Sequence, residues 1–173
     1  SLALGAACGG GGEKKDATAS APTPGVANDT ITVGNLVPLS DAVALIGKPI
    51  LAGEEAYFAE LNAKGGIGGK YKVKVISEDV TYANPSTSVQ KYNKIKDQIA
   101  AFAMILGTDH VNVTLPLMAE DNILAIPTTF DAEWVREPHL IPTMPPYQVQ
   151  VANGIDYWWN KAGGQGKPIC TMS

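Results

Sequence analysis

The stretch Ile31 to Asp79, ITVGNLVPLSDAVALIGKPILAGEEAYFAELNAKGGIGGKYKVKVISED, runs from an apolar strand through a polar loop and an amphipathic helix to a second strand. Its glycines follow the helix and precede the strand. A phosphate-binding loop has the opposite order, with the helix N-terminus after the loop facing the anion. Lys70 is also followed by Tyr71, where such a loop supplies a hydroxyl for magnesium. The glycines therefore indicate a turn in which Gly65 caps the helix C-terminus.

Hydrophobic spacing predicts the elements of this stretch. Apolar residues alternate from Ile31 to Val37, as in a strand. Helical spacing follows, with Pro49 in the first turn and one face packed on a sheet. The apolar residues of that face are Ile50, Leu51, Tyr57, Phe58 and Leu61. Lysines then alternate with apolar residues over residues 70–75, which predicts an edge strand that resists pairing with other chains.

The same alternation continues to about residue 127. Asn84 and Pro85 start a helix, whose buried stripe is Val89, Tyr92, Ile95 and Ile99. IAAFAMILG (99–107) is typical of a parallel strand covered on both faces. A helix is expected over about residues 112–121, where Pro116 should kink it, and NILAIP (122–127) predicts a short buried strand.

The C-terminal part predicts three more elements. LIPTMPP (140–146) indicates a brief extended segment. A helix follows, in which Val151, Ile155, Trp158 and Trp159 form the packing stripe. KPICTM (167–172) is expected to begin another strand, with Cys170 as a small buried thiol.

Strands that alternate with helices predict an α/β fold built on a doubly wound parallel sheet. In such sheets ligands bind beyond the carboxyl ends of the strands. Four loops should therefore meet at one edge: PLSDA (38–42), EDVTYAN (78–84), GTDHVN (107–112) and PTTFDAEW (127–134).

Composition narrows the class of protein. The 173 residues are 45% hydrophobic and 17% charged, as in one ordinary globular domain. The net charge of −4 and the isolated Arg136 argue against a nucleic-acid partner. Cys8 and Cys170 lie far apart, without a CxxC or a histidine pair nearby, so neither a metal site nor a disulfide framework is indicated. No cofactor is expected.

The N-terminal 29 residues differ from the rest. SLALGAAC (1–8) resembles the lipobox of bacterial lipoproteins, although Gly5 stands where the pattern usually has Leu. The resemblance implies that a signal segment ends before Cys8 and that Cys8 carries the lipid. The alternative is an ordinary N-terminus with an incidental cysteine. Residues 9–29 are rich in Gly, Ala, Ser, Thr and Pro without apolar periodicity, which predicts a flexible tether.

Four segments resemble the extracellular solute receptors of ABC importers, in the type I periplasmic binding protein branch that binds leucine, isoleucine, valine and amides. They are ITVGNLVPLSD (31–41), GEEAYFAELNAKGGIGGKYKVKVISED (53–79), ILGT (105–108) and NILAIP (122–127). The resemblance implies that residues 30–173 are an incomplete N-terminal lobe without its second lobe. It also implies an extracytoplasmic receptor that delivers an amino acid, amide or related small carboxylate to a permease.

The resemblance also implies solute contacts. Amino-acid-binding members hold the ligand carboxylate with hydroxyl and backbone N–H groups after the third and fourth strands, where helix dipoles favour an anion. The matching residues here are Gly107, Thr108, Thr128 and Thr129. The usual Ser-rich stretch is replaced by Asp109 and His110, and an aspartate there repels a carboxylate, which argues against an α-amino acid.

Three residues in the other loops are further expected contacts: Ser40, and the rings of Tyr82 and Phe130, which would stack on a solute. Each expected contact has a structural alternative. The threonines cap helices or turns, Ser40 and Asp41 cap the first helix, and the rings pack within their loops. Trp134 lies either at the cleft rim or in the core.

Two other functions remain open. A sensory domain of the same fold would report the solute to a partner instead of delivering it. An enzyme would have to pair Asp109 and His110 with Thr108 or Asp131, but adjacent residues of one loop seldom face the same reacting atom. The sequence has no GxSxG, HExxH or strand-then-GxGxxG motif, so a non-enzymatic receptor is the favoured reading.

Overall fold

The structure is a computed structural model that describes residues 23–170. The lipobox at residues 1–8 with Cys8, and the tether up to residue 22, lie outside the described residues. Residues 171–173, the end of the last predicted strand, lie outside them too.

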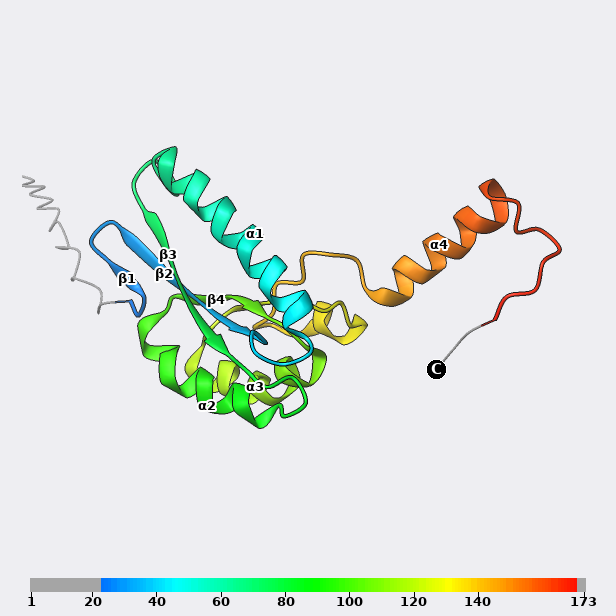
Figure 1. Cartoon of the computed structure of the whole chain (residues 1–173). Coiled ribbons are helices and arrows are strands. Elements are labelled where there is room, and N and C mark those ends of the chain that lie inside the picture. Colours follow the sequence, from blue (N-terminus) through cyan, green and yellow to red (C-terminus); the bar gives the residue numbers. More distant parts are fainter. Residues whose placement is uncertain (1–22, 171–173) are drawn as a thin grey trace, which may run out of the picture.

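A five-stranded sheet forms the centre of the protein (Figure 1). β2 lies between β3 and β4, β5 lies beyond β4, and these four strands are parallel. The strands are β1 (Val26–Ala27), β2 (Thr30–Val37), β3 (Lys72–Asp79), β4 (Ala101–Ile105) and β5 (Ala125–Pro127). β3 pairs only with β2 among the described residues, so its alternating lysines do belong to an edge strand.

β1 corrects the predicted extent of the tether. Val26 and Ala27 pair antiparallel with the start of β2, opposite Ile31 and Thr30. Composition alone assigned these two residues to a flexible segment. A two-residue strand carries no periodicity of its own, so only its partner reveals it.

The helices cover both faces of the sheet. α1 lies over one face, while α2 and α3 lie over the other (Figure 1). Their bounds are α1 (Ala44–Ala63), α2 (Ser86–Ile95), α3 (Thr108–Asp121) and α4 (Tyr147–Lys161), with short 3₁₀ turns η1 (Lys96–Gln98) and η2 (Ala132–Arg136). This is the predicted doubly wound arrangement. None of these helices is both long and apolar enough to span a bilayer.

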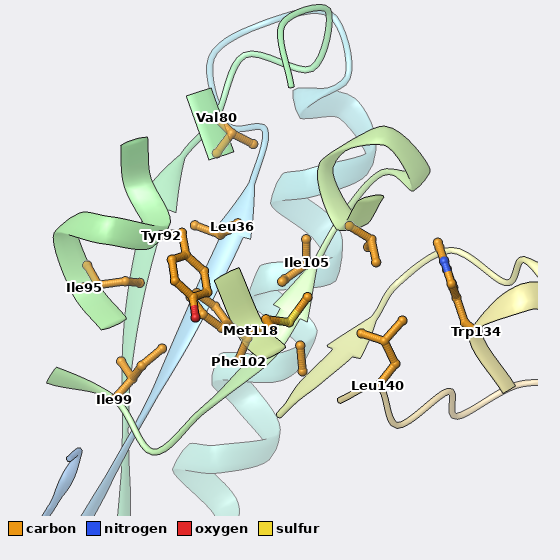
Figure 2. Packing of buried hydrophobic residues seen from close by; sticks show 12 residues of the cluster. Leu36, Val80, Tyr92, Ile95, Ile99, Phe102, Ile105, Met118, Trp134 and Leu140 are labelled. Atoms are coloured by element: carbon orange, nitrogen blue, oxygen red, sulfur yellow. The ribbon is translucent and has the colours of Figure 1, made fainter. Parts of the chain in front are cut away.

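The main core lies between the sheet and the α2–α3 layer (Figure 2). Tyr92 of α2 stacks on Phe102 of β4 with ring centroids 5.1 Å apart. Met118 of α3 is also fully buried, and burying one side chain of this size stabilises the fold by about 1.5 to 3 kcal/mol. Trp134 of η2 is only 2% exposed, so it belongs to the core and not to a cleft rim.

The C-terminus of α1 confirms the predicted glycine cap. Gly65 follows the helix with a φ of +111°, a backbone conformation that residues with a side chain rarely adopt. The Gly66 N–H donates to Leu61 O at 2.9 Å, which satisfies a free helix carbonyl. A Cβ on Gly66 would lie 2.1 Å from Tyr71 O, so this glycine also lets the next strand approach.

Asn62 joins α1 to the edge of the sheet. Its side-chain Nδ2 donates to Val73 O at 2.8 Å, and its Oδ1 accepts from Val73 N at 2.7 Å. The Asn62 amide therefore makes the two hydrogen bonds to Val73 that a neighbouring strand would otherwise make. This contact helps to explain why a helix with few buried residues stays on its face of the sheet.

Two helix starts differ from their predictions. α1 begins at Ala44, so Pro49 lies inside the helix and not in its first turn. The carbonyl that loses its partner there belongs to Leu45, which is 85% exposed, so water can satisfy it. α3 begins at Thr108, directly after Gly107, about four residues before the predicted start, and it continues through Pro116.

The C-terminal predictions are partly wrong. α4 forms, but none of its residues is buried, and it extends away from the sheet (Figure 1). The rings of Trp158 and Trp159 meet edge-on with centroids 6.3 Å apart, and Trp159 is 43% exposed. The described part of KPICTM is not a strand, and Cys170 is exposed instead of buried.

A later segment of the chain pairs with the edge of β5. Ala125 N donates to His139 O and Ala125 O accepts from Ile141 N, both at 2.9 Å. The extended segment around Leu140 therefore occupies the place beside Ala125 where a later strand would pair. The predicted extended segment is thus confirmed, and it takes the role of the neighbouring strand.

We predict that Asn62→Ala lowers the free energy of unfolding by about 1 to 2 kcal/mol, because two hydrogen bonds to Val73 are lost. Urea denaturation followed by circular dichroism measures this. Asn93→Ala is the control, since the Asn93 amide bonds only to the carbonyl of Val89 on the exposed face of α2. Equal destabilisation by the two variants would contradict the role of Asn62.

Candidate functional site

The four parallel strands bring four loops to one edge of the sheet. The loops follow β2, β3, β4 and β5, as the sequence predicted. Thr128 N donates to Ile105 O at 3.0 Å, which joins the end of β5 to the end of β4. Gly107 and Pro127 therefore open onto the same edge.

A carboxylate at the end of β3 holds the first loop. Asp79 Oδ1 accepts from the Leu39 N–H at 2.7 Å, and the Ser40 hydroxyl also donates to this carboxylate. Burial raises the pKa of Asp79, but the hydrogen bonds from Ser40 and Leu39 and the charge of Lys91 outweigh it, so the pKa lies below its ordinary value. The Ser40 hydroxyl, expected to face a solute, is engaged in this structural contact.

A second aspartate joins the first loop to the second. Asp41 Oδ1 accepts from Val43 N at 2.8 Å, which forms a local turn just before α1. Its Oδ2 accepts from the Tyr82 N–H at 2.6 Å. Asp41 therefore fixes the position of Tyr82, and neither Ser40 nor Asp41 makes a side-chain cap on α1.

His110 joins the second loop to α3. The imidazole is 1% exposed, with Nδ1 2.6 Å from Ser88 Oγ and Nε2 3.0 Å from Tyr82 O. Both ring nitrogens are thus engaged inside the protein. The sequence alone left His110 without a partner, because its partners lie 22 and 28 residues away.

Three polar side chains meet where the third and fourth loops touch. The Thr108 hydroxyl lies 2.8 Å from Asp131 Oδ2 and 3.3 Å from the Thr129 hydroxyl. Thr108 is half-buried and begins α3, but no side chain caps that helix. The sequence suggested a role for Asp131 only if the protein were an enzyme. In the structure Asp131 accepts the hydrogen bond that orients the Thr108 hydroxyl.

The remaining predicted contacts divide into two groups. Thr128 Oγ1 lies 3.3 Å from Ile105 O, so its hydroxyl is bonded within the sheet edge. Phe130 packs edge-on against Tyr147, with centroids 5.6 Å apart. Asp109 is exposed in the first turn of α3, and Tyr82 is partly exposed at the same edge.

The geometry separates the residues that an enzyme would need. Asp109 is exposed, whereas His110 beside it is buried with both ring nitrogens engaged. The Thr108 hydroxyl bonds to the Asp131 carboxylate, and His110 takes no part in this hydrogen bond. No cluster of three His, Cys, Asp or Glu side chains suited to a metal occurs within residues 23–170.

The sheet order defines an α/β lobe whose loops meet at the carboxyl edge of a parallel sheet, and the comparisons show its family. The family model described as periplasmic binding protein matches residues 30–172. The chain therefore belongs to the periplasmic binding protein family.

Relatives and solved structures support the same family. The chain is 33% identical over 99 residues to Leu/Ile/Val-binding protein homolog 2 of Brucella abortus, covering 56% of this chain and 26% of that protein. It is 29% identical over 110 residues to the Leu/Ile/Val-binding protein BraC3 of Rhizobium johnstonii, covering 62% and 29%. The chain thus spans between a quarter and a third of the length of these relatives.

One solved structure is similar over most of the chain. It is the fatty acid ABC transporter substrate-binding protein from Thermomonospora curvata, with a TM-score of 0.71 and 25% identity. The match covers 80% of this chain and 35% of that one.

We predict that Asp79→Asn destabilises the protein by about 1 kcal/mol at neutral pH, because charge-assisted hydrogen bonds to the first loop are weakened. The folded-state pKa of Asp79 is lowered from its ordinary value of 3.8, so its contribution is complete above that value and disappears as the pH falls below it. Urea unfolding at several pH values should show the difference between wild type and variant constant from about pH 7 to 5 and smaller below about pH 4. A difference that stays unchanged at low pH would contradict this assignment.

Proposed function

We propose that the complete protein is an extracytoplasmic receptor that captures a small solute between this lobe and a second lobe and delivers it to an ABC permease. The observation that carries the proposal is the convergence of four loops, with hydroxyl and aromatic side chains, at the carboxyl edge of a parallel sheet. Membership of the periplasmic binding protein family supports an extracytoplasmic location.

The proposed solute is an amino acid, an amide or a related small carboxylate. Relatives and a structural neighbour are named for leucine, isoleucine and valine or for fatty acids, which join a polar head to an apolar part. In this lobe Thr108 and Thr129 would meet the polar head. The nearby carboxylates of Asp109 and Asp131 favour a head that donates hydrogen bonds, such as an amide, over a bare carboxylate.

A lipid anchor at Cys8 is the proposed link to the membrane. The small residues before Cys8 and the polar stretch after it support this reading. Two or more acyl chains would hold the protein firmly, since each buried methylene contributes about 0.8 kcal/mol.

We predict that Thr108→Ala and Thr129→Ala each weaken solute binding by the complete receptor by about 1.5 to 3 kcal/mol, if each hydroxyl bonds to a charged group of the solute. Isothermal titration calorimetry against amino acids, amides, urea and small carboxylates provides the measurement. Thr30→Ala is the matched control, because Thr30 begins β2 at the opposite edge of the sheet.

Unchanged affinity in both variants would show that these threonines are structural. A panel in which nothing binds, combined with turnover of any member, would overturn the receptor proposal in favour of an enzyme.

We predict that Cys8→Ala moves the full-length precursor from the membrane fraction to the soluble fraction, because the acylated thiol is lost. Fractionation of cells and incorporation of labelled palmitate test this. Continued membrane attachment of the variant, without label in the wild type, would rule out the anchor.

A further inference from the structure

Tyr82 is held at the site edge in an unusual way for a loop aromatic. Its ring remains 39% exposed, although neighbouring side chains fix its backbone from two sides. The N–H donates to Asp41 Oδ2 at 2.6 Å, and the carbonyl lies 3.0 Å from His110 Nε2.

The contacts of the His110 ring indicate which of its two nitrogens carries the hydrogen in the neutral form. A carbonyl oxygen only accepts, so Nε2 of His110 must carry the hydrogen that bonds to Tyr82 O. In the neutral imidazole Nδ1 then accepts from the Ser88 hydroxyl, 2.6 Å away. Both nitrogens of the buried ring therefore have partners, and the ring links α2, α3 and the loop after β3.

The rings of His110 and Tyr82 also touch, and Gly107 makes this possible. Their centroids are 5.5 Å apart. A Cβ on Gly107 would lie 2.7 Å from His110 Cδ2 and 2.9 Å from Tyr82 Cε2, and its φ of +117° also disfavours other residues. Gly107 therefore leaves room for the His110 ring to pack against the Tyr82 ring.

We infer that Tyr82 selects solutes by their apolar part and that His110 is the residue that positions it. The inference rests on the proposed receptor function and adds a specificity-determining side chain to it. An aromatic ring fixed before binding offers a large contact area at a small cost in conformational entropy. Polar groups at Thr108 and Thr129 would hold the head of the solute, while the Tyr82 ring packs against its apolar remainder.

The test measures affinity of the complete receptor for three matched series: acetamide, hexanamide and benzamide; alanine, leucine and phenylalanine; and acetate, hexanoate and benzoate. Tyr82→Ala should weaken binding of the large members about tenfold and leave the smallest member nearly unchanged. His110→Leu should reduce selectivity in the same way, and adding it to Tyr82→Ala should have little further effect. His110→Gln retains an N–H donor near the Nε2 position and should restore part of the selectivity.

His139→Leu is the control for replacing a histidine, since His139 makes no contact with Tyr82. Thermal unfolding checks that each variant is folded, and His110→Gln carries the test if His110→Leu is not. Loss of selectivity in Tyr82→Ala but not in the folded His110 variants would overturn the positioning role. Unchanged selectivity in Tyr82→Ala, while Thr108→Ala still weakens binding, would overturn this inference but leave the receptor function intact. Absence of binding to all three series by the wild type would overturn both.

Discussion

The parallel pairing of β2 with both neighbours is the constraint on which the rest of the structure depends. β2 is in register with β3 along its whole length, from Thr30 opposite Lys72 to Val37 opposite Asp79, and it pairs with β4 on its other side. Because β5 continues the parallel order, every strand of this set ends at the same edge. The loops that follow must therefore meet there, whatever their sequences.

Polar side chains then turn these neighbouring loops into one connected edge. Asp79 and Asp41 bind backbone N–H groups of the first and second loops, His110 binds the second loop to α3, and Asp131 binds the residue that starts α3. Much of the polar chemistry at the site is thus used to position loops. This explains why Ser40 and Thr128, two expected solute contacts, have their hydroxyls engaged within the protein.

The sequence predicted the order of strands and helices because periodicity and glycine caps are local signals, as the edge strand with its lysines and the cap at Gly65 show. Other features depended on distant partners. His110 is buried because its ring contacts Ser88 and Tyr82, which lie far away in the sequence. A helix predicted from Thr108 onward would have placed His110 on the same buried face as Thr114 and Met118. Residues 167–170 of the predicted last strand pair with no strand, and the segment 139–141 bonds to Ala125 at the edge of β5, a contact between distant residues that periodicity does not reveal.

Hydrogen–deuterium exchange of the complete receptor, with and without its tightest-binding solute, shows whether the four loops at the carboxyl edge of the sheet contact the solute. Binding should slow exchange in the segments 38–43, 80–85, 107–110 and 128–131, while exchange at the opposite edge of the sheet, including the β1–β2 turn at residues 28 and 29, stays unchanged. Protection confined to that opposite edge, or none at all in these four segments while the solute is bound, would contradict the predicted contact.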